Sequence, residues 1–202
     1  MALIRSTRQH LRRWRFAGAD RRIARTIDTL RRDASFGVNL GCGSFRVDGL
    51  INCDRYEETA DRRVDLLDVV QEFGESSVDH LESHHALEHL SIEESHLALR
   101  EWVRVLKPGG SLVITCPDLD ALARDWVRSD EDRRWSRLLP MIYGSQEHVG
   151  MFHRSGFNRH RLSHLVAALG CELLVVHSPF PLARSTPSIV VVARKRLSSS
   201  PD

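Results

Sequence analysis

VNLGCGS at residues 38–44 is the stretch of sequence that decides the fold, together with INCD at residues 51–54. A short apolar run breaks into Gly41-x-Gly43, and a second apolar run ends in Asp54. Parallel α/β sheets bind nucleosides in this way, because glycines let the backbone approach the ligand and the acid accepts hydrogen bonds from ribose hydroxyls. The pattern therefore predicts an α/β fold with a nucleoside site at these residues.

The spacing differs from a dinucleotide-binding fingerprint in two ways. Arg46 occupies the position of the third glycine, and Asp54 comes sooner than the separation of about 20 residues that the dinucleotide pattern requires. The link from Leu40 to Leu50 has nine residues, fewer than a crossover helix with its loops needs. We therefore expect a nucleoside cofactor other than a dinucleotide, and a first crossover helix that is shortened or missing.

The rest of the chain alternates strand-like and helix-like segments, which favours an α/β, Rossmann-like, mostly parallel sheet. Ser91 and Glu94 form a capping-box pattern at the start of a helix over 92–106, and the β-branched run 111–116 follows it. A short connector joins the last two apolar runs, so we expect an antiparallel last strand. Strands are expected at 38–40, 50–53, 63–65, 78–83, 111–116, 172–178 and 188–194, and further helices at 119–129 and 160–170.

Composition and charge narrow the class of protein. The 202 residues suit one domain, and 42% apolar with 28% charged residues are typical of a soluble globular protein. No apolar run reaches the ~18 residues that span a bilayer, and arginines interrupt the N-terminal apolar segment, unlike a signal peptide. The four cysteines show no metal-finger spacing, so we expect reduced thiols and a cytoplasmic protein.

Residues 1–33 hold ten Arg and three Asp, a local charge of +7 against +2 for the whole chain. Apolar residues at helical spacing predict a basic N-terminal helical arm there. Such an arm either touches nucleic acid, an anionic membrane surface or an acidic partner, or packs on the domain edge with its arginines solvated. The main domain is expected at 34–196, with a polar, irregular lid or cap at 130–157, and a disordered tail at 197–202.

Five motifs, in order from 38 to 118, resemble those of the class I S-adenosylmethionine-dependent methyltransferases. They are the glycine stretch, the acid of INCD, VDLLD at 64–68, HHALEHL at 84–90 and LKPGGSLVITCPD at 106–118. The chain is most similar to a bacterial group of the methyltransferase domain 11 type with a shortened first crossover, which also carries a stretch like GSQEHVGMFHRSGF at 144–157. The resemblance implies that residues 34–196 form a methyltransferase domain that uses S-adenosyl-L-methionine.

The resemblance also assigns cofactor roles to individual residues. The glycine backbone is implied to lie against the methionine part of S-adenosylmethionine, and Asp54 to accept hydrogen bonds from both ribose hydroxyls. Asp65 is implied to accept from the adenine amino group, while the Leu66 amide serves a ring nitrogen. The implied cofactor-binding residues are Gly41, Cys42, Gly43, Asp54, Asp65, Leu66 and His84.

Two departures from the family pattern concern the amino-acid end of the cofactor. Asn39 stands where many members carry an acid. The missing first helix removes the usual helix N-terminus behind the cofactor carboxylate. Ser44 or Arg46 is left to contact that carboxylate.

Methyl transfer needs a general base only when the acceptor is a hydroxyl or a protonated amine. His85 at the sheet edge and His153 in the lid are the candidate catalytic bases, because imidazole titrates near neutral pH. The alternative is that each only lines or supports the pocket. The histidine spacing matches neither HExxH nor a Cys/His finger, so we expect no metal site.

Three functions fit these observations. The favoured one is methylation of a small molecule, a sugar or a natural-product intermediate. The second is an RNA methyltransferase that grips phosphates with residues 1–33. The third is a non-catalytic module that binds S-adenosylmethionine and a partner. The acceptor and the oligomeric state do not follow from the motifs.

Overall fold

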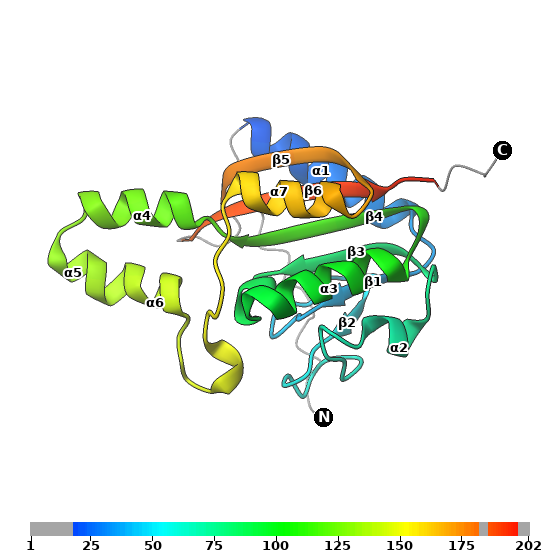
Figure 1. Cartoon of the computed structure of the whole chain (residues 1–202), viewed down its shortest axis with the longest axis horizontal. Helices are drawn as coiled ribbons and strands as arrows, with labels where there is room; N and C mark the ends of the chain where they lie inside the picture. The colour runs from blue at the N-terminus through cyan, green and yellow to red at the C-terminus, as the bar shows by residue number, and fades with distance from the viewer. Residues whose placement is uncertain (1–17, 182–185, 198–202) are drawn as a thin grey trace, which may run out of the picture.

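A six-stranded sheet forms the centre of the computed structural model, which describes residues 18–181 and 186–197. Its strands are β1 (Gly37–Leu40), β2 (Ile51–Cys53), β3 (Val78–His84), β4 (Leu106–Pro117), β5 (Cys171–Pro181) and β6 (Pro187–Lys195). Their order is β2-β1-β3-β4-β6-β5; β1 to β4 are parallel, and β6 is antiparallel to both of its neighbours (Figure 1). The mostly parallel, Rossmann-like sheet with its antiparallel last strand is confirmed.

Two strand predictions differ from the structure. β4 begins at Leu106, earlier than predicted, because its pairing with β3 starts at that residue and continues from Ser111 after a register shift. The predicted strand at 63–65 is wrong. A single bridge joins Arg62 to Cys53, and the Asp65 carboxylate then accepts a hydrogen bond from an amide two residues on, which turns the chain away from the sheet.

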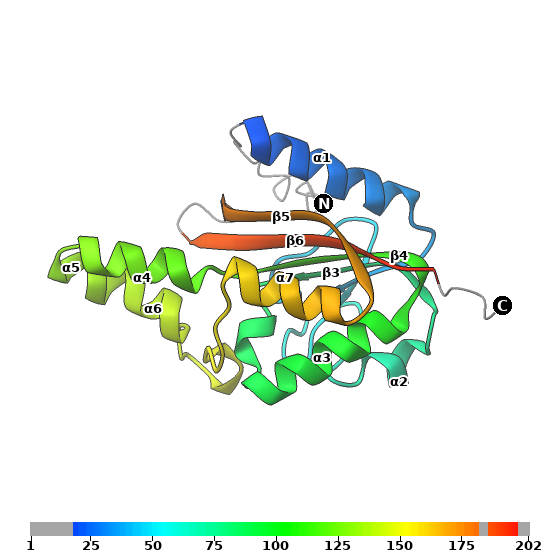
Figure 2. The ribbon, with the colours of Figure 1, turned by 45° about the horizontal axis from the view of Figure 1, so that its top comes forward.

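Helices α3 (Ile92–Val105), α7 (Arg159–Ala168) and the short α2 (Val69–Phe73) cover one face of the sheet over the main hydrophobic core (Figure 2). The capping box of α3 is confirmed, because the Ser91 hydroxyl accepts from the Glu94 amide at 3.2 Å and the Glu94 carboxylate from the Ser91 amide at 2.8 Å. Trp102 of α3 is fully buried and donates its indole N–H to the Leu66 carbonyl at 2.9 Å. This bond ties α3 to the turn that carries VDLLD.

Helix α1 (Gly18–Asp33) lies across the opposite face of the sheet (Figure 2). Ile23 and Ile27 form a second, smaller core with Val113 of β4 and with Val190 and Val192 of β6. The described part of the predicted basic arm is therefore a helix packed on the sheet. The first 17 residues of the arm lie outside the described residues, as does most of the predicted tail.

The described residues 41–50, which join β1 to β2, contain no helix, so the missing first crossover helix is confirmed. Crossovers are right-handed, and this one runs across the sheet in the opposite direction from the β3–α3–β4 unit, so its helix would have covered the face opposite α3. α1 lies on that face instead. The shortened connection therefore leaves room there for Arg31 of α1 to reach Glu82 of β3.

The segment 130–157, predicted to be irregular, is helical over its first half. After α4 (Leu119–Arg128), α5 (Glu131–Arg133), a π-helical turn (Arg134–Leu138) and α6 (Leu139–Tyr143) return toward the sheet. The Asp130 side chain caps this second arm by accepting from the Arg133 amide at 2.8 Å, and the rings of Trp126 and Trp135 meet edge to face. The resulting helical hairpin extends from the carboxyl edge of the parallel strands (Figure 1).

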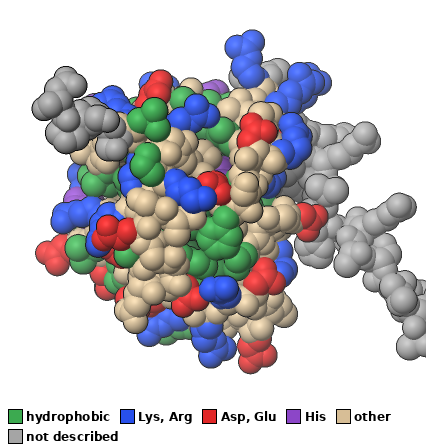
Figure 3. All heavy atoms as spheres, turned by 90° about the vertical axis from the view of Figure 1, so that its right-hand side faces the viewer, with side chains coloured by type: hydrophobic (Ala, Val, Ile, Leu, Met, Phe, Trp, Pro, Cys, Tyr) green, Lys and Arg blue, Asp and Glu red, His purple; other side chains and the backbone are tan. Residues whose placement is uncertain are grey.

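Charges of both signs are mixed on the face turned toward the viewer in Figure 3, where Lys and Arg side chains intersperse with Asp and Glu around a hydrophobic patch. This face does not present the single-sign field that draws nucleic acid to a protein. Among the described residues, no helix is both long enough and apolar enough to cross a membrane.

Candidate functional site

The glycine loop after β1 has the backbone that close approach of a ligand requires. Gly41 and Gly43 both have positive φ, 64° and 45°, a region that other residues rarely adopt. A Cβ at Gly41 would lie 2.4 Å from the Ala86 Cβ, so that position is filled by the protein itself. A Cβ at Gly43 would meet no described atom within 4 Å. The open side of the loop is therefore at Gly43.

Asp54 lies directly against this loop, at the carboxyl end of β2. Its Oδ2 accepts the Gly43 amide at 2.8 Å, and its Oδ1 accepts the amides of Tyr56 and Glu57 at 2.7 and 3.0 Å. A carboxylate has about four acceptor positions, so three backbone donors leave about one for a ligand. Contact with both ribose hydroxyls, which remains a prediction, requires Asp54 to share or release one of these amides.

Asp65 and Leu66 flank the same loop from the turn before α2. Asp65 Oδ1 accepts the Leu67 amide at 3.0 Å, and the other oxygen pairs with Arg55. The Leu66 side chain reaches to within 3.5 Å of the Cβ position of Gly41. The structure thus brings the predicted adenine-side residues beside the glycine loop.

Cys42 and Asn39 form the buried floor of the loop. Burial, with the negative charge of Asp54, raises the pKa of the Cys42 thiol to about 11, so the thiol is neutral near pH 7. The Asn39 side-chain amide donates to the Phe45 carbonyl and to Asn52 Oδ1, both at 3.0 Å. Its own Oδ1 is buried and finds no hydrogen-bond partner among the described residues. An acceptor without a donor thus lies beneath the loop.

The two residues expected to contact the cofactor carboxylate are both exposed. Arg46 pairs with Asp61 and with the Thr59 carbonyl, so its guanidinium is turned to the loop after β2. Ser44 is left as the nearer of the two to the open side at Gly43, its immediate neighbour in the chain.

His84 belongs to a buried network that the sequence did not indicate. Glu82, fully buried on β3, accepts from the His80 and His84 rings at 2.7 Å each and from Arg31 of α1 at 2.8 and 2.9 Å. Burial alone would raise the pKa of Glu82, but these donors hold it well below its ordinary range. The side chain of His84 is therefore structural, and only its backbone remains available to line the predicted cofactor site.

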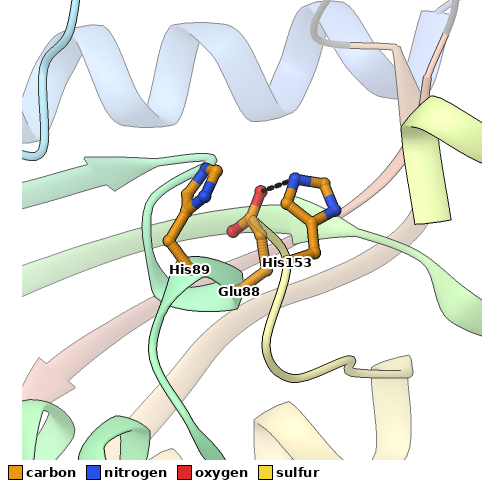
Figure 4. Close-up of side chains that lie close together, drawn as sticks. All are labelled: Glu88, His89 and His153. Atoms are coloured by element: carbon orange, nitrogen blue, oxygen red, sulfur yellow. Dashed lines mark ion pairs between the residues drawn. The ribbon is translucent and has the colours of Figure 1, made fainter. Parts of the chain in front are cut away.

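His85 and His153, the two candidate bases, converge on Glu88 at the carboxyl edge of the sheet. His85 has a φ of 53°, a conformation rare outside glycine, and its Nδ1 lies 3.3 Å from Glu88 Oε1. His153 Nε2 lies 4.0 Å from the same oxygen (Figure 4). The sequence indicated both histidines but not Glu88 as their common neighbour, since the contact of His153 with Glu88 depends on the return of the lid segment.

Burial lowers the pKa of His153, against the raising effect of the nearby Glu88 carboxylate. The His153 imidazole is therefore neutral near pH 7 and able to accept a proton. A partly open hollow of about 20 Å³ adjoins Glu88 and His153 and is lined largely by apolar side chains from β4, α4 and α6. This volume holds about one water molecule. The lining side chains from these elements are Pro117, Leu119, Leu122, Met141 and Ile142.

Part of the chain matches a known family. Residues 49–114 match the family described as a methyltransferase domain, a segment that runs from the end of the β1–β2 connection into β4. No curated protein matches the chain.

Solved structures share the fold. A SAM-dependent methyltransferase from Methanosarcina mazei superposes with a TM-score of 0.56 at 15% identity, covering 80% of this chain and 92% of its own. One from Archaeoglobus fulgidus gives 0.57 at 14% identity, covering 88% and 93%. The Burkholderia thailandensis 1,6-didemethyltoxoflavin-N1-methyltransferase, solved with 1,6-didemethyltoxoflavin and S-adenosylhomocysteine, gives 0.52 at 16% identity, covering 88% and 83%.

Proposed function

We propose that the chain is a class I S-adenosylmethionine-dependent methyltransferase and that it methylates a small molecule, a sugar or a natural-product intermediate. The observation that carries the proposal is the hydrogen bond of 2.8 Å between the Gly43 amide and Asp54 Oδ2, which joins an open, left-handed glycine loop to a carboxylate at the next strand end. This is the arrangement that holds a nucleoside at the carboxyl edge of a parallel sheet.

The residues around the loop fit S-adenosylmethionine. The open space at Gly43 admits the methionine part, and the buried, unpaired Asn39 Oδ1 provides an acceptor for its amino group. Asp54 accepts from the ribose. Asp65 and the Leu66 amide, beside Gly41, serve the adenine. The proposed cofactor set is thus Gly41, Cys42, Gly43, Asp54, Asp65, Leu66 and the backbone at His84.

S-adenosylmethionine supplies a methyl group activated by its sulfonium, so the chain has chiefly to align the acceptor and exclude water. His153 is the better placed of the two candidate bases, because its half-buried imidazole is neutral and its Nε2 lies 4.0 Å from a carboxylate that would stabilise the imidazolium. His85 instead bonds Ser188 Oγ through Nε2 at 2.9 Å while its Nδ1 faces Glu88. We assign it a supporting role at the same site.

The side chains beneath the helical hairpin favour a small acceptor over RNA. The hollow beside His153 is lined largely by apolar side chains, whereas nucleic acid is bound in positively charged grooves. Arg31 of the predicted arm is occupied by Glu82, and Ile23 and Ile27 pack on the sheet. These contacts favour an arm that is structural over residues 18–33. Among the structural relatives described above, the Burkholderia enzyme carries a small molecule.

Calorimetric titration with S-adenosylhomocysteine tests the cofactor site. Asp54→Asn removes a charged acceptor of ligand and loop donors, worth about 1.5–3 kcal/mol, so affinity is expected to fall at least about tenfold. Asp48→Asn, which removes an exposed acid from the same connection, is the matched control and is expected to leave affinity unchanged. Equal affinities in the two variants would overturn the assignment of Asp54.

A further inference from the structure

Glu88, His89 and His153 come together at the carboxyl edge of the sheet, although His153 lies far along the chain from the other two (Figure 4). One ligand atom from each lies within 4.8 Å of the others. The backbone fixes this meeting, because the Glu88 carbonyl accepts the amides of Arg154 and Ser155 at 2.8 and 3.1 Å. The residue after His153 is thereby tied directly to Glu88.

The Glu88 carboxylate is the group in this cluster that the fold does not explain. The residue is 2% exposed, its carboxylate oxygens make no well-formed hydrogen bond to a described residue, and the nearest donor is His85 Nδ1, 3.3 Å from Oε1. His85 thus faces one oxygen, and a buried carboxylate that is so sparsely paired gains from a further cation. In Figure 4 its oxygens lie between the rings of His89 and His153.

Both histidines have the backbone hydrogen bonds that prepare an imidazole for metal binding. His89 Nδ1 lies 3.2 Å from the Phe152 carbonyl, so it donates there and leaves the lone pair on Nε2. The His153 ring likewise bonds the backbone of Ile142. Metal-binding histidines almost always donate their second N–H in this way, which fixes the tautomer and the ring orientation.

We propose that Glu88, His89 and His153 bind one divalent transition-metal ion through two imidazole nitrogens and one carboxylate oxygen. While the ion is bound, His153 is a ligand, and the base role given to it above applies only to the metal-free protein. Ligand atoms around a tetrahedral ion with bonds of about 2.1 Å lie about 3.4 Å apart, so the 4.0 Å between Glu88 Oε1 and His153 Nε2 closes by a small side-chain rotation. Two nitrogen ligands favour Zn²⁺ or Co²⁺ over Mg²⁺, which prefers oxygen. Histidine spacing alone predicted no such site, because the third ligand comes from the lid.

Calorimetric titration of the full chain with Zn²⁺ tests the proposal. His160 and His164 stack on successive turns of α7 and form a second imidazole pair, so every protein in the series carries His160→Ala and His164→Ala. We expect one Zn²⁺ per chain, weaker binding of Co²⁺ and no binding of Mg²⁺. Affinity is expected to fall at least about 100-fold in His89→Ala and in His153→Ala.

His148→Ala is the matched control, since it removes a lid histidine outside the cluster and is expected to leave Zn²⁺ affinity unchanged. Circular dichroism and titration with S-adenosylhomocysteine show that each variant is folded. Equal Zn²⁺ affinity in His89→Ala, His153→Ala and His148→Ala would overturn the metal site, as would the absence of stoichiometric binding. Because S-adenosylhomocysteine binding is read separately, a failure of the metal site is distinguishable from a failure of the proposed function.

Discussion

Substituting alanine at Gly41 imposes two costs in folding free energy that glycine avoids: a strained backbone conformation and a steric clash with Ala86. The φ of 64° costs a residue with a Cβ about 1–2 kcal/mol, and the loss of glycine's freedom in the unfolded chain returns about 0.4–1 kcal/mol. The added Cβ would lie 2.4 Å from the Ala86 Cβ, well inside normal carbon contact, and overpacking of this kind costs about 1–3 kcal/mol. Gly41→Ala is therefore expected to lower the free energy of unfolding by about 2–4 kcal/mol.

Gly49→Ala supplies the reference, because its φ is 83° and no described atom lies within 4 Å of its Cβ. Only the conformational cost, about 1 kcal/mol, is expected there. Urea unfolding followed by circular dichroism measures both variants, and adding Ala86→Gly to Gly41→Ala should recover most of the difference. If Gly41→Ala and Gly49→Ala unfold within about 0.5 kcal/mol of each other, the packing of the loop against Ala86 is wrong.

Gly43→Ala, with a φ of 45° and the same open surroundings, extends the comparison to function. Its stability is expected to match that of Gly49→Ala. Its affinity for S-adenosylhomocysteine is expected to fall at least about tenfold, because the new methyl group occupies the space assigned to the ligand. Unchanged affinity would place the ligand elsewhere.

Three further predictions concern stability. Glu82→Gln removes a buried charge that Arg31 and two imidazoles surround, and is expected to cost about 3–5 kcal/mol in urea unfolding at pH 7. Hydrogen bonds lower the pKa of Glu82 in the folded state despite its burial. The contribution of its carboxylate to the free energy of unfolding is therefore full above the ordinary carboxyl pKa and is lost as the pH falls toward the folded-state pKa. Unfolding measured over a pH series should show this decline at acid pH in the wild type and a weaker decline in Glu82→Gln. Trp102→Phe leaves the Leu66 carbonyl without its donor and opens a cavity, so it is expected to lower the free energy of unfolding by about 2–3 kcal/mol. The midpoint of thermal unfolding should fall accordingly, and an unchanged midpoint would contradict the hydrogen bond. Ser91→Ala breaks the capping box of α3 and is expected to cost about 1 kcal/mol, with Ser91→Thr near neutral as the control.

Local patterns predicted most of the sheet and the glycine loop at which we propose cofactor binding. The Gly-x-Gly loop, the short link to β2 and the capping box of α3 depend on neighbours in sequence, and the structure has all three. The contact of Gly43 with Asp54 follows from the parallel pairing of β1 and β2, which brings their carboxyl ends to one edge.

Features that depend on tertiary contacts escaped the sequence patterns. One interpretation of the N-terminal charge pattern left the arginines solvated. Arg31 of α1 instead pairs with Glu82, because the missing crossover helix leaves that face of β3 accessible. The cluster around Glu88 forms only when the lid segment returns to the sheet. The helices of that segment were missed because each is short, Pro140 interrupts the helical pattern, and the contact of Trp126 with Trp135 joins residues of separate elements.

The position of the ribose in a crystal structure with S-adenosylhomocysteine tests the central claim most directly. We predict its hydroxyl oxygens within about 2.6–3.0 Å of the Asp54 carboxylate, with the amino-acid part of the ligand against the backbone at Gly43. A ribose bound away from Asp54, or a ligand bound outside the carboxyl edge of β1 and β2, would contradict the account.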